Sequence, residues 1–404
     1  MDLEIGPWKT NEYWVSHYQF QPEVMGQLQL PEKVEFHDST LRDGEQAPGI
    51  VFSPKQKVEI AKMLDAAGFQ YIEAGFPPVS KADREAISEI TGLGLNAKIT
   101  CLSRARAEDI QMAADCGVWG AILEVPGSQA RLKYQFGWSE DDVIKKTVSA
   151  CAMAREKGLA AIPFIMDSSR AELPFLIRLI NAVERESGAE KVALVDTSGC
   201  ATPRGWYYMV NEVRKNIDLP IEVHCHDDFG MGVANSLAGI EAGATSVSAV
   251  MCGLGQRAGN APMEEIIWSV QALYNMPTGI NFPKLYEVAL KVQELSGWSW
   301  PPNKAVIGRN LFTWEAGIPT AALRKNPHTV EPFQPEVFGR THDIILGKKA
   351  GKANVEFKLE ELGLRASDEQ ADKLLEQVKT ESVRLGRALT NDEFKKIHHD
   401  TTNP

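Results

Sequence analysis

The sequence has no long apolar run. No stretch approaches the roughly 20 consecutive apolar residues that a membrane-spanning helix requires, and the opening segment MDLEIGPWKTNEYW has no basic region followed by an apolar one. These absences argue against a membrane-spanning or secreted protein. They predict a cytoplasmic location and no membrane partner.

Paired cysteines and an excess of positive charge are also absent. The six cysteines are scattered singly and form no CxxC pair, which predicts buried reduced thiols rather than disulfides or metal ligands. The formal net charge of −11 argues against nucleic acid as a partner. It does not exclude a small anionic substrate, because a local arginine is enough to bind one.

What the sequence does contain is a repeated alternation of short apolar runs with amphipathic stretches. Segments such as 53–67 and 141–157 have apolar residues at helical spacing. Eight such units predict an α/β fold, a (β/α)₈ TIM barrel. An open doubly wound sheet is the competing fold, but the GxGxxG fingerprint of its dinucleotide-binding version is absent. The eight apolar runs are 34–40, 70–76, 97–102, 121–125, 160–166, 192–196, 221–226 and 245–252.

The strand rhythm stops after about residue 280, which suggests a division of the chain. The Pro/Gly/Trp-rich segment 296–310 is typical of a linker, and the charged segment 359–399 is helical in pattern, with candidate N-caps at Ser367 and Thr390. We therefore expect an N-terminal extension lying across the barrel (1–32), a TIM-barrel catalytic domain (33–290), and a linker with a small, mainly helical C-terminal subdomain (291–404).

The segment HDSTLRDGEQAPG at 37–49 places several charged residues after the first apolar run. In a TIM barrel the active site lies at the C-terminal ends of the strands. Asp38 and Arg42 are therefore functional candidates. The alternative is an Asp–Arg ion pair that closes a turn.

A second polar cluster, IEVHCHDDFGMGVANS, begins at residue 221. Side chains at positions i and i+2 of a strand share a face, so His224 and His226 can bind one cation. Asn260 follows the eighth apolar run, which in a closed barrel neighbours the first and seventh. Asp38, His224, His226 and Asn260 can therefore converge on one site, and their donor atoms suit Zn²⁺, Mn²⁺ or Mg²⁺.

These motifs also carry a family resemblance. With EAGFPPVSKAD (73–83), DTSGCATP (196–203) and EPFQPEVFGRTHDIILGKKAG (331–351), they resemble the metal-dependent barrel synthases that make 2-isopropylmalate, homocitrate and citramalate. The resemblance covers the whole barrel, with the motifs in order. It implies a divalent-metal enzyme, usually a homodimer, that condenses acetyl-CoA with a 2-oxo acid.

The resemblance assigns roles to individual residues. Arg42 would bind the carboxylate of the 2-oxo acid and polarise its carbonyl, and a bidentate guanidinium suits that role. A structural carboxylate is the alternative for Glu73. The predicted metal ligands are Asp38, His224, His226 and Asn260. The predicted substrate-binding residues are Arg42, Glu73, Arg131 and Thr197, and the predicted catalytic residues are Arg42, Asp43, Glu45 and Gln256.

The chain departs from the family pattern in the part that forms the acetyl-CoA enolate. Gln256 stands where a glutamate is usual, and Trp314 and Pro319 stand where the family has histidines. Candidate replacement bases are Glu315, His328, His342 and Asp228. Three functions therefore stay open from the sequence: a condensing acyltransferase, a lyase or aldolase that uses the same metal without acetyl-CoA, and a metal- or oxo-acid-binding protein with little catalysis.

Overall fold

The computed structural model describes residues 6–402, and the chain forms two compact units. The larger unit runs from Tyr18 to Ser299. The smaller unit combines the N-terminal segment up to His17 with the chain from Trp300 onward. Residues 1–5 of the predicted N-terminal extension and residues 403–404 of the predicted C-terminal subdomain lie outside the described residues. Among the described helices, none is long and apolar enough to cross a membrane.

The larger unit is a closed barrel of parallel strands in which each strand pairs with the next and β8 pairs with β1. This confirms the predicted (β/α)₈ fold. The strands are β1 (Glu35–Asp38), β2 (Tyr71–Glu73), β3 (Lys98–Arg104), β4 (Gly120–Pro126), β5 (Ala160–Met166), β6 (Val192–Asp196), β7 (Ile221–Cys225) and β8 (Ser246–Ala249).

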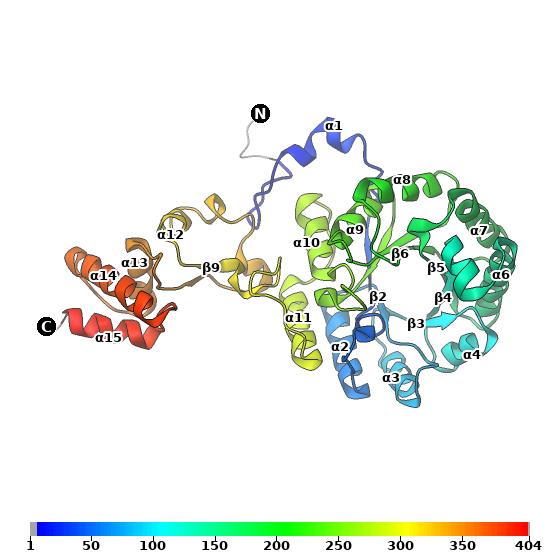
Figure 1. The fold of residues 1–404 in the computed structure, drawn as a ribbon, viewed down its shortest axis with the longest axis horizontal. Coiled ribbons are helices and arrows are strands. Elements are labelled where there is room, and N and C mark those ends of the chain that lie inside the picture. Colours follow the sequence, from blue (N-terminus) through cyan, green and yellow to red (C-terminus); the bar gives the residue numbers. More distant parts are fainter. Residues whose placement is uncertain (1–5, 403–404) are drawn as a thin grey trace. The chain divides into compact units, whose positions relative to one another are not determined.

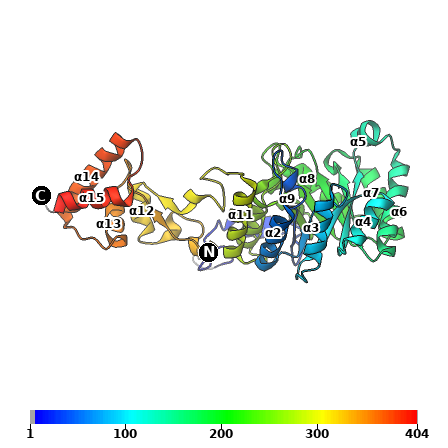
Figure 2. The same ribbon diagram turned by 90° about the horizontal axis from the view of Figure 1, so that it is seen from below.

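Helices follow the strands and surround the barrel (Figure 1). Figure 2 shows the short helix α5 at one end of the barrel, beyond the longer helices α4, α6 and α7. The helices of this unit are α1 (Pro22–Met25), α2 (Pro54–Ala67), α3 (Lys81–Thr91), α4 (Ala107–Asp115), α5 (Gln129–Arg131), α6 (Glu140–Glu156), α7 (Leu173–Glu186), α8 (Pro203–Arg214), α9 (Gly232–Glu241), α10 (Met263–Leu273) and α11 (Phe282–Ser296).

The local sequence explains where the helices begin and end. Before α2, the Ser53 hydroxyl accepts a hydrogen bond from the Gln56 N–H, and the Gln56 side chain accepts one from the Ser53 N–H. After α2, Gly68 has a φ of +100°, which a residue with a side chain rarely adopts. These caps fix the ends of the helix that follows β1.

The barrel interior contains a buried charged network as well as an apolar core. Glu222 lies 2.5 Å from Lys191 Nζ and 3.1 Å from His37 Nδ1, and all three residues are buried. His37 Nε2 also contacts the Thr100 hydroxyl at 2.8 Å. The network shows that His37 points into the barrel. The apolar cluster in the interior consists of Leu102, Ile122, Ile162, Phe164, Met166, Ala193 and Val195.

The smaller unit is mainly helical. Its strands β9 (Thr313–Trp314) and β10 (Asp343–Ile344) form a parallel pair. The predicted N-caps are confirmed: the hydroxyls of Ser367 and Thr390 accept hydrogen bonds from the backbone N–H groups of Gln370 and Glu393. The helices are α12 (Gly317–Leu323), α13 (Lys352–Glu361), α14 (Asp368–Leu385) and α15 (Asn391–Thr402).

The N-terminal segment does not lie wholly across the barrel as expected. Tyr13 forms an antiparallel bridge with Phe333 of the smaller unit, and the Trp14 N–H donates to the Pro332 carbonyl. The later part contacts the barrel, where the Gln29 N–H donates to a carbonyl of α9. The backbone pairing of residues 13 and 14 assigns the early part of the predicted extension to the smaller unit. No sequence pattern indicates this pairing.

All six cysteines lie within the described residues and are thiols rather than disulfides, in agreement with the prediction of reduced thiols. Five of them are buried, but Cys200 is exposed. Cys200 lies in the loop after β6, where its N–H donates to the Asp196 carboxylate at 3.2 Å. The expectation of burial was therefore wrong for this one position, because a polar turn places it at the barrel surface.

Candidate metal and substrate site

A cavity of about 250 Å³ lies within the larger unit, at the C-terminal ends of the barrel strands. The strands β3 to β7 and the loops after β1, β2 and β8 contribute its walls. Charged residues in these walls include Arg42, Asp43, Glu124, Arg131 and Arg257. Apolar side chains line the rest of the cavity: Phe76, Leu102, Phe164, Met166 and Val195. The location agrees with the position of active sites in TIM barrels.

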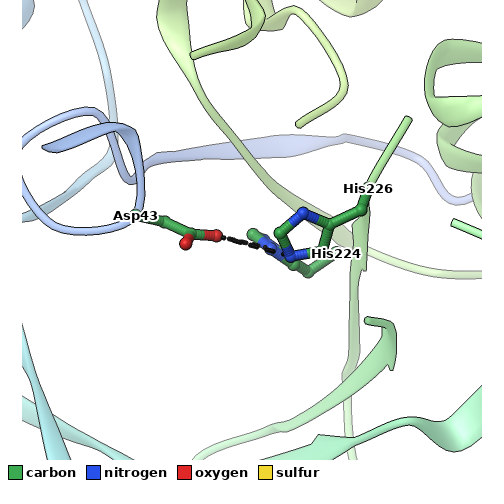
Figure 3. Close-up of side chains that lie close together, drawn as sticks. All are labelled: Asp43, His224 and His226. Atoms are coloured by element: carbon green, nitrogen blue, oxygen red, sulfur yellow. Dashed lines mark ion pairs between the residues drawn. The ribbon is translucent and has the colours of Figure 1, made fainter. Parts of the chain in front are cut away.

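Three buried side chains in this cavity form a group that could hold a metal ion: Asp43, His224 and His226. Asp43 Oδ2 lies 3.0 Å from His224 Nε2 and 3.7 Å from His226 Nε2. Figure 3 shows the carboxylate pointing from the loop after β1 toward the two imidazoles on and just after β7. One carboxylate and two imidazoles are a frequent ligand set for a divalent transition metal.

Hydrogen bonds at Nδ1 of each histidine leave Nε2 directed at Asp43. His226 Nδ1 lies 3.2 Å from the Gly259 carbonyl, which can only accept, so Nδ1 carries the proton and Nε2 has a free lone pair. His224 Nδ1 contacts the Ser248 hydroxyl at 3.0 Å. Burial lowers the pKa of His226 to about 4, so its ring is neutral at physiological pH, as a metal ligand must be.

Asp43 is ionised despite its burial. Burial by itself raises the pKa of its carboxyl, but the adjacent Arg42 guanidinium and the two imidazoles outweigh this effect and hold the pKa well below its ordinary value. Arg42 Nη1 lies 3.2 Å from Asp43 Oδ1. The second oxygen, Oδ2, is therefore available as an anionic ligand.

Three buried atoms at this site make no hydrogen bond: Asp43 Oδ2, His224 Nε2 and the Asn260 side-chain oxygen. Asn260 lies beside His226, with which it forms a backbone bridge, and its side-chain N–H donates to the Leu254 carbonyl at 2.9 Å. Buried polar atoms are rarely left unsatisfied in native proteins. A cation bound by these atoms would satisfy them, so the donor set fits a divalent metal.

The glycines of the loop after β8 allow the chain to wrap closely around Asn260. Gly255 has a φ of +146°, and a Cβ atom there would lie 2.3 Å from the Asn260 side-chain nitrogen. At Gly259, a Cβ atom would lie 2.0 Å from the Gly253 carbonyl oxygen. Only glycine fits these positions.

Asp38 is not a member of the group around the histidines, contrary to the sequence prediction. Side chains alternate along a strand, and His37 occupies the interior position, so Asp38 points out of the barrel. Its carboxylate accepts hydrogen bonds from the backbone and hydroxyl of Thr40 at 3.0 and 2.9 Å. Burial raises the pKa of Asp38 to about 7, against the lowering effect of the Thr40 bonds. Asp43 takes the place predicted for Asp38.

Arg42 is held in the cavity by Glu73. The Arg42 Nε–H donates to Glu73 Oε1 at 2.7 Å, and the second Glu73 oxygen accepts from the Ser39 hydroxyl. Arg42 is only 7% exposed, and its Nη2 makes no hydrogen bond. Glu73 therefore orients Arg42, and Arg42 keeps buried N–H donors for an anion.

Thr197, Arg131 and Gln256 also line the cavity, and their roles stay predictions. The Thr197 hydroxyl oxygen accepts from the Asp167 N–H at 2.7 Å, so its own hydrogen stays available. Gln256 is exposed, and its side-chain N–H donates to Gln46 at 3.1 Å.

Glu45 does not line this cavity. One of its oxygens lies 2.6 Å from Lys57 Nζ, and the other accepts from the Phe52 N–H at 2.7 Å. Lys57 is buried and also pairs with Asp83. Both oxygens of Glu45 therefore hold the loop after β1, and Glu45 lines a neighbouring cavity of about 310 Å³ instead, so its predicted catalytic role stays a prediction.

The candidate replacement bases already have partners. Asp228 forms an ion pair with Arg257 in the larger unit. In the smaller unit, Glu315 pairs with Lys349, His328 contacts Gln334, and His342 Nε2 lies 2.8 Å from Glu331. Trp314 donates to the same Glu331 at 2.7 Å.

Sequence reasoning assigned no role to several residues of the cavity, among them Glu124 and Met166. Both lie on strands whose apolar runs were predicted, but no motif marks them. The sequence feature that could have identified Glu124 is its charge within an otherwise apolar run. A charged residue in a barrel strand faces either solvent or the barrel interior.

The fold and the site define a (β/α)₈ barrel with a candidate divalent-metal centre at its strand ends. A model of the HMGL-like family matches residues 33–292, and a model described as homocitrate synthase post-HMGL domain-like matches residues 306–384. The chain belongs to the HMGL-like family.

Curated relatives match nearly the whole chain. It is 43% identical over 375 residues to the homocitrate synthase AksA of Methanopyrus kandleri, covering 93% of this chain and 94% of that protein. Two relatives from Methanocaldococcus jannaschii are also similar. The (R)-citramalate synthase CimA is 41% identical over 91% of this chain and 75% of its own length. The 2-isopropylmalate synthase is 38% identical over 94% of this chain and 73% of its own length.

Solved structures agree on the fold. The HMG-CoA lyase of Bacillus subtilis superposes with a TM-score of 0.61 at 21% identity, covering 69% of this chain and 98% of that one. At this identity the likeness concerns the barrel alone. The more similar curated relatives are named as synthases, so the comparisons support the condensing interpretation of the sequence and not its two alternatives.

Proposed function

We propose that the protein is an acyltransferase of the 2-isopropylmalate/homocitrate synthase type, which condenses acetyl-CoA with a 2-oxo acid. The observation that carries the proposal is the buried group of Asp43, His224 and His226, with unsatisfied ligand atoms, in the same cavity as the free N–H of Arg42. A metal centre beside a guanidinium matches the adjacent oxo and carboxylate groups of a 2-oxo acid. The names of the relatives support the same reaction.

The metal ligands that we propose are Asp43, His224 and His226, with Asn260 as a fourth. Asp43 replaces Asp38 in this set because of the distances given above. The donor set suits Mn²⁺, Mg²⁺ or Zn²⁺. When bound, a divalent cation supplies Lewis-acid stabilisation of the negative charge that develops on the substrate oxygen.

The chain's own residues bind and orient the oxo acid. The free Nη2 of Arg42 donates to the substrate carboxylate, and the Thr197 hydroxyl donates its remaining hydrogen to the same group. Glu73 keeps the guanidinium in this direction through its 2.7 Å bond to Nε. Charge-assisted bonds of this kind are about twice as strong as neutral ones, so Arg42 contributes most of the anchoring.

The acyl thioester approaches through a second cavity in our proposal. This cavity, of about 310 Å³, lies beside the first and shares Arg42, Gln46 and Phe76 with it. Its lining is mainly apolar, with Ile50 and Phe52 among its walls. An apolar passage beside the oxo-acid site suits the flexible arm of a coenzyme A thioester. Gln256, near the shared rim, can donate hydrogen bonds but cannot take up a proton.

The test is the release of free thiol from acetyl-CoA by the Mn²⁺- or Mg²⁺-loaded protein with a panel of 2-oxo acids, with products identified by mass spectrometry. We expect release that depends on a 2-oxo acid and falls about 10²-fold or more in Arg42→Gln. Arg185→Gln, an exposed arginine on α7, is the matched control. Consumption of an oxo acid without thiol release would instead establish a lyase or aldolase.

Two further predictions belong to the proposal, one from the family resemblance and one from the lack of membrane and signal segments in the sequence. We propose that the protein is a homodimer in the cytoplasm. Light scattering coupled to size-exclusion chromatography tests the first point, because a homodimer has twice the 44.6 kDa mass of the chain. Cell fractionation tests the second.

A further inference from the structure

The cavity contains a cationic side chain, that of Arg131, to which the proposed reaction assigns no role. Arg131, the last residue of α5, lines the cavity, and its Nε is buried and makes no hydrogen bond. Its Nη1 donates to Gln135 at 2.8 Å and contacts the Met166 sulfur at 3.3 Å. A thioether is a weak acceptor, so these contacts do not neutralise the guanidinium.

The other arginines of the cavity have anionic partners, whereas Arg131 has none among the described residues. Arg42 pairs with Glu73 and Asp43, and Arg257 pairs with Asp228 at 2.9 Å. In the described part of the chain, no carboxylate lies within 4.0 Å of the Arg131 guanidinium. An arginine cannot lose its proton in a protein, so its charge requires either water or an anion.

Glu124 is the carboxylate in the cavity wall that could compete for Arg131. The two residues do not form an ion pair within 4.0 Å in the described structure. Burial raises the pKa of Glu124, although Arg42 and Arg131 partly oppose this effect. Glu124 therefore does not cancel the charge of Arg131 as a close partner would.

The surface between the two arginines is apolar. Leu102, Phe164 and Met166 belong to one packed cluster of the barrel interior and also line the cavity. Arg42 lies on the β1 side, over the Phe164 ring at 5.7 Å, and Arg131 lies beyond Met166. The cavity surface is thus cationic at Arg42, apolar in the middle and cationic at Arg131. This arrangement matches a ligand with an anionic group at each end of a short carbon chain.

We propose that Arg131 is a specificity-determining residue that binds a second, distal anionic group of the substrate, so that the protein acts on a 2-oxo acid carrying a further carboxylate or phosphonate. This inference rests on the proposed function, since it assigns the carboxylate beside the oxo group to Arg42. The positive charge of Arg131 favours such a substrate over 2-oxo acids with a plain alkyl side chain.

The experiment compares substrates matched in length but not in distal charge. The first pair is 2-oxoglutarate and 2-oxohexanoate, and the second is phosphonopyruvate and 2-oxobutyrate. For each, kcat/KM is measured by thiol release with the metal-loaded wild type, Arg131→Gln, Arg131→Lys and the control Arg185→Gln. Oxo-acid binding without acetyl-CoA is measured in parallel by titration calorimetry.

We expect the wild type to prefer the charged member of a pair, and Arg131→Gln to lower kcat/KM for that member by about 10- to 100-fold while sparing the uncharged member. Arg131→Lys should recover part of the loss. The better of the two charged substrates identifies the distal anion as carboxylate or phosphonate.

An equal loss for charged and uncharged substrates would overturn the inference, because it would show that Arg131 acts on the fold, for example by pairing with Glu124. Absence of any preference in the wild type would overturn it as well. If no oxo acid releases thiol, the proposed function fails, and calorimetry then decides the role of Arg131 alone. Tighter binding of 2-oxoglutarate by the wild type than by Arg131→Gln supports that role, and equal binding refutes it.

Discussion

The assignment of Asp43 rather than Asp38 to the metal leads to a direct comparison of two variants. Asp43→Asn and Asp38→Asn each replace one carboxyl group with an amide of the same size, and the two positions are five residues apart. Only Asp43 directs an oxygen at both imidazoles, at 3.0 and 3.7 Å. Asp38 bonds to Thr40 on the other side of the strand.

The expected magnitudes differ accordingly. Replacing residues that merely support metal ligands costs about 10- to 100-fold in metal affinity, so the loss of an anionic ligand should exceed about 100-fold, or about 2.7 kcal/mol. Asp38→Asn should leave metal affinity nearly unchanged. Its cost should appear in the free energy of unfolding instead, at about 1–3 kcal/mol, because a buried hydrogen bond with Thr40 is disturbed.

The assay is titration calorimetry of the metal-free variants with Mn²⁺, together with urea unfolding followed by circular dichroism. Wild-type protein and Arg185→Gln provide the reference affinities. Loss of Mn²⁺ binding in Asp38→Asn with retention in Asp43→Asn would refute the strand-parity reasoning. Equal losses in two variants of equal stability would show that both carboxylates bind the metal.

Three further predictions follow from other parts of the barrel. Glu73→Gln should reduce kcat/KM for the oxo acid by about 10-fold without abolishing Mn²⁺ binding, because it weakens the bond that orients Arg42; steady-state kinetics and calorimetry check the two effects separately. Lys191→Met should lower the free energy of unfolding by about 3–5 kcal/mol, because it removes a partner of the buried Glu222 charge; urea denaturation measures this, and a change below about 1 kcal/mol would contradict it. Burial raises the pKa of Asp38 from its ordinary 3.8 to about 7, so the folded state holds a proton that the unfolded state has released. This contribution to stability is present at low pH and is lost as pH rises through 7, by roughly 2–3 kcal/mol between pH 5 and pH 8. Urea unfolding of wild type and Asp38→Asn at both pH values should show that the variant lacks this decline.

The barrel itself could be predicted from the sequence because its signals are local. The apolar runs expected at 160–166 and 192–196 coincide with β5 and β6. The sequence signals for helix ends are equally local, as the caps at Ser367 and Thr390 show. The spacing of His224 and His226 at positions i and i+2 also predicted that they lie together, since alternation along a strand places both side chains on one face.

The third ligand could not be predicted in this way. His37 and Asp38 are adjacent and both polar, so alternation requires one of them to face inward but does not say which. The buried network with Glu222 decides in favour of His37. Asp43 then reaches the histidines from a loop, whose path depends on contacts such as that between Glu45 and Lys57.

The sequence by itself therefore determined the order of strands and helices, the histidine pair and the arginine at the end of β1, because each depends on residues close together in the chain. Tertiary structure alone decided that Asp43 meets the histidines, that Arg131 faces the cavity with no anionic partner in the described part of the chain, and that the N-terminal segment pairs with the smaller unit. The physical reason is that these contacts join residues far apart in sequence. Their formation depends on the closure of the barrel and the paths of its loops, which no local pattern specifies.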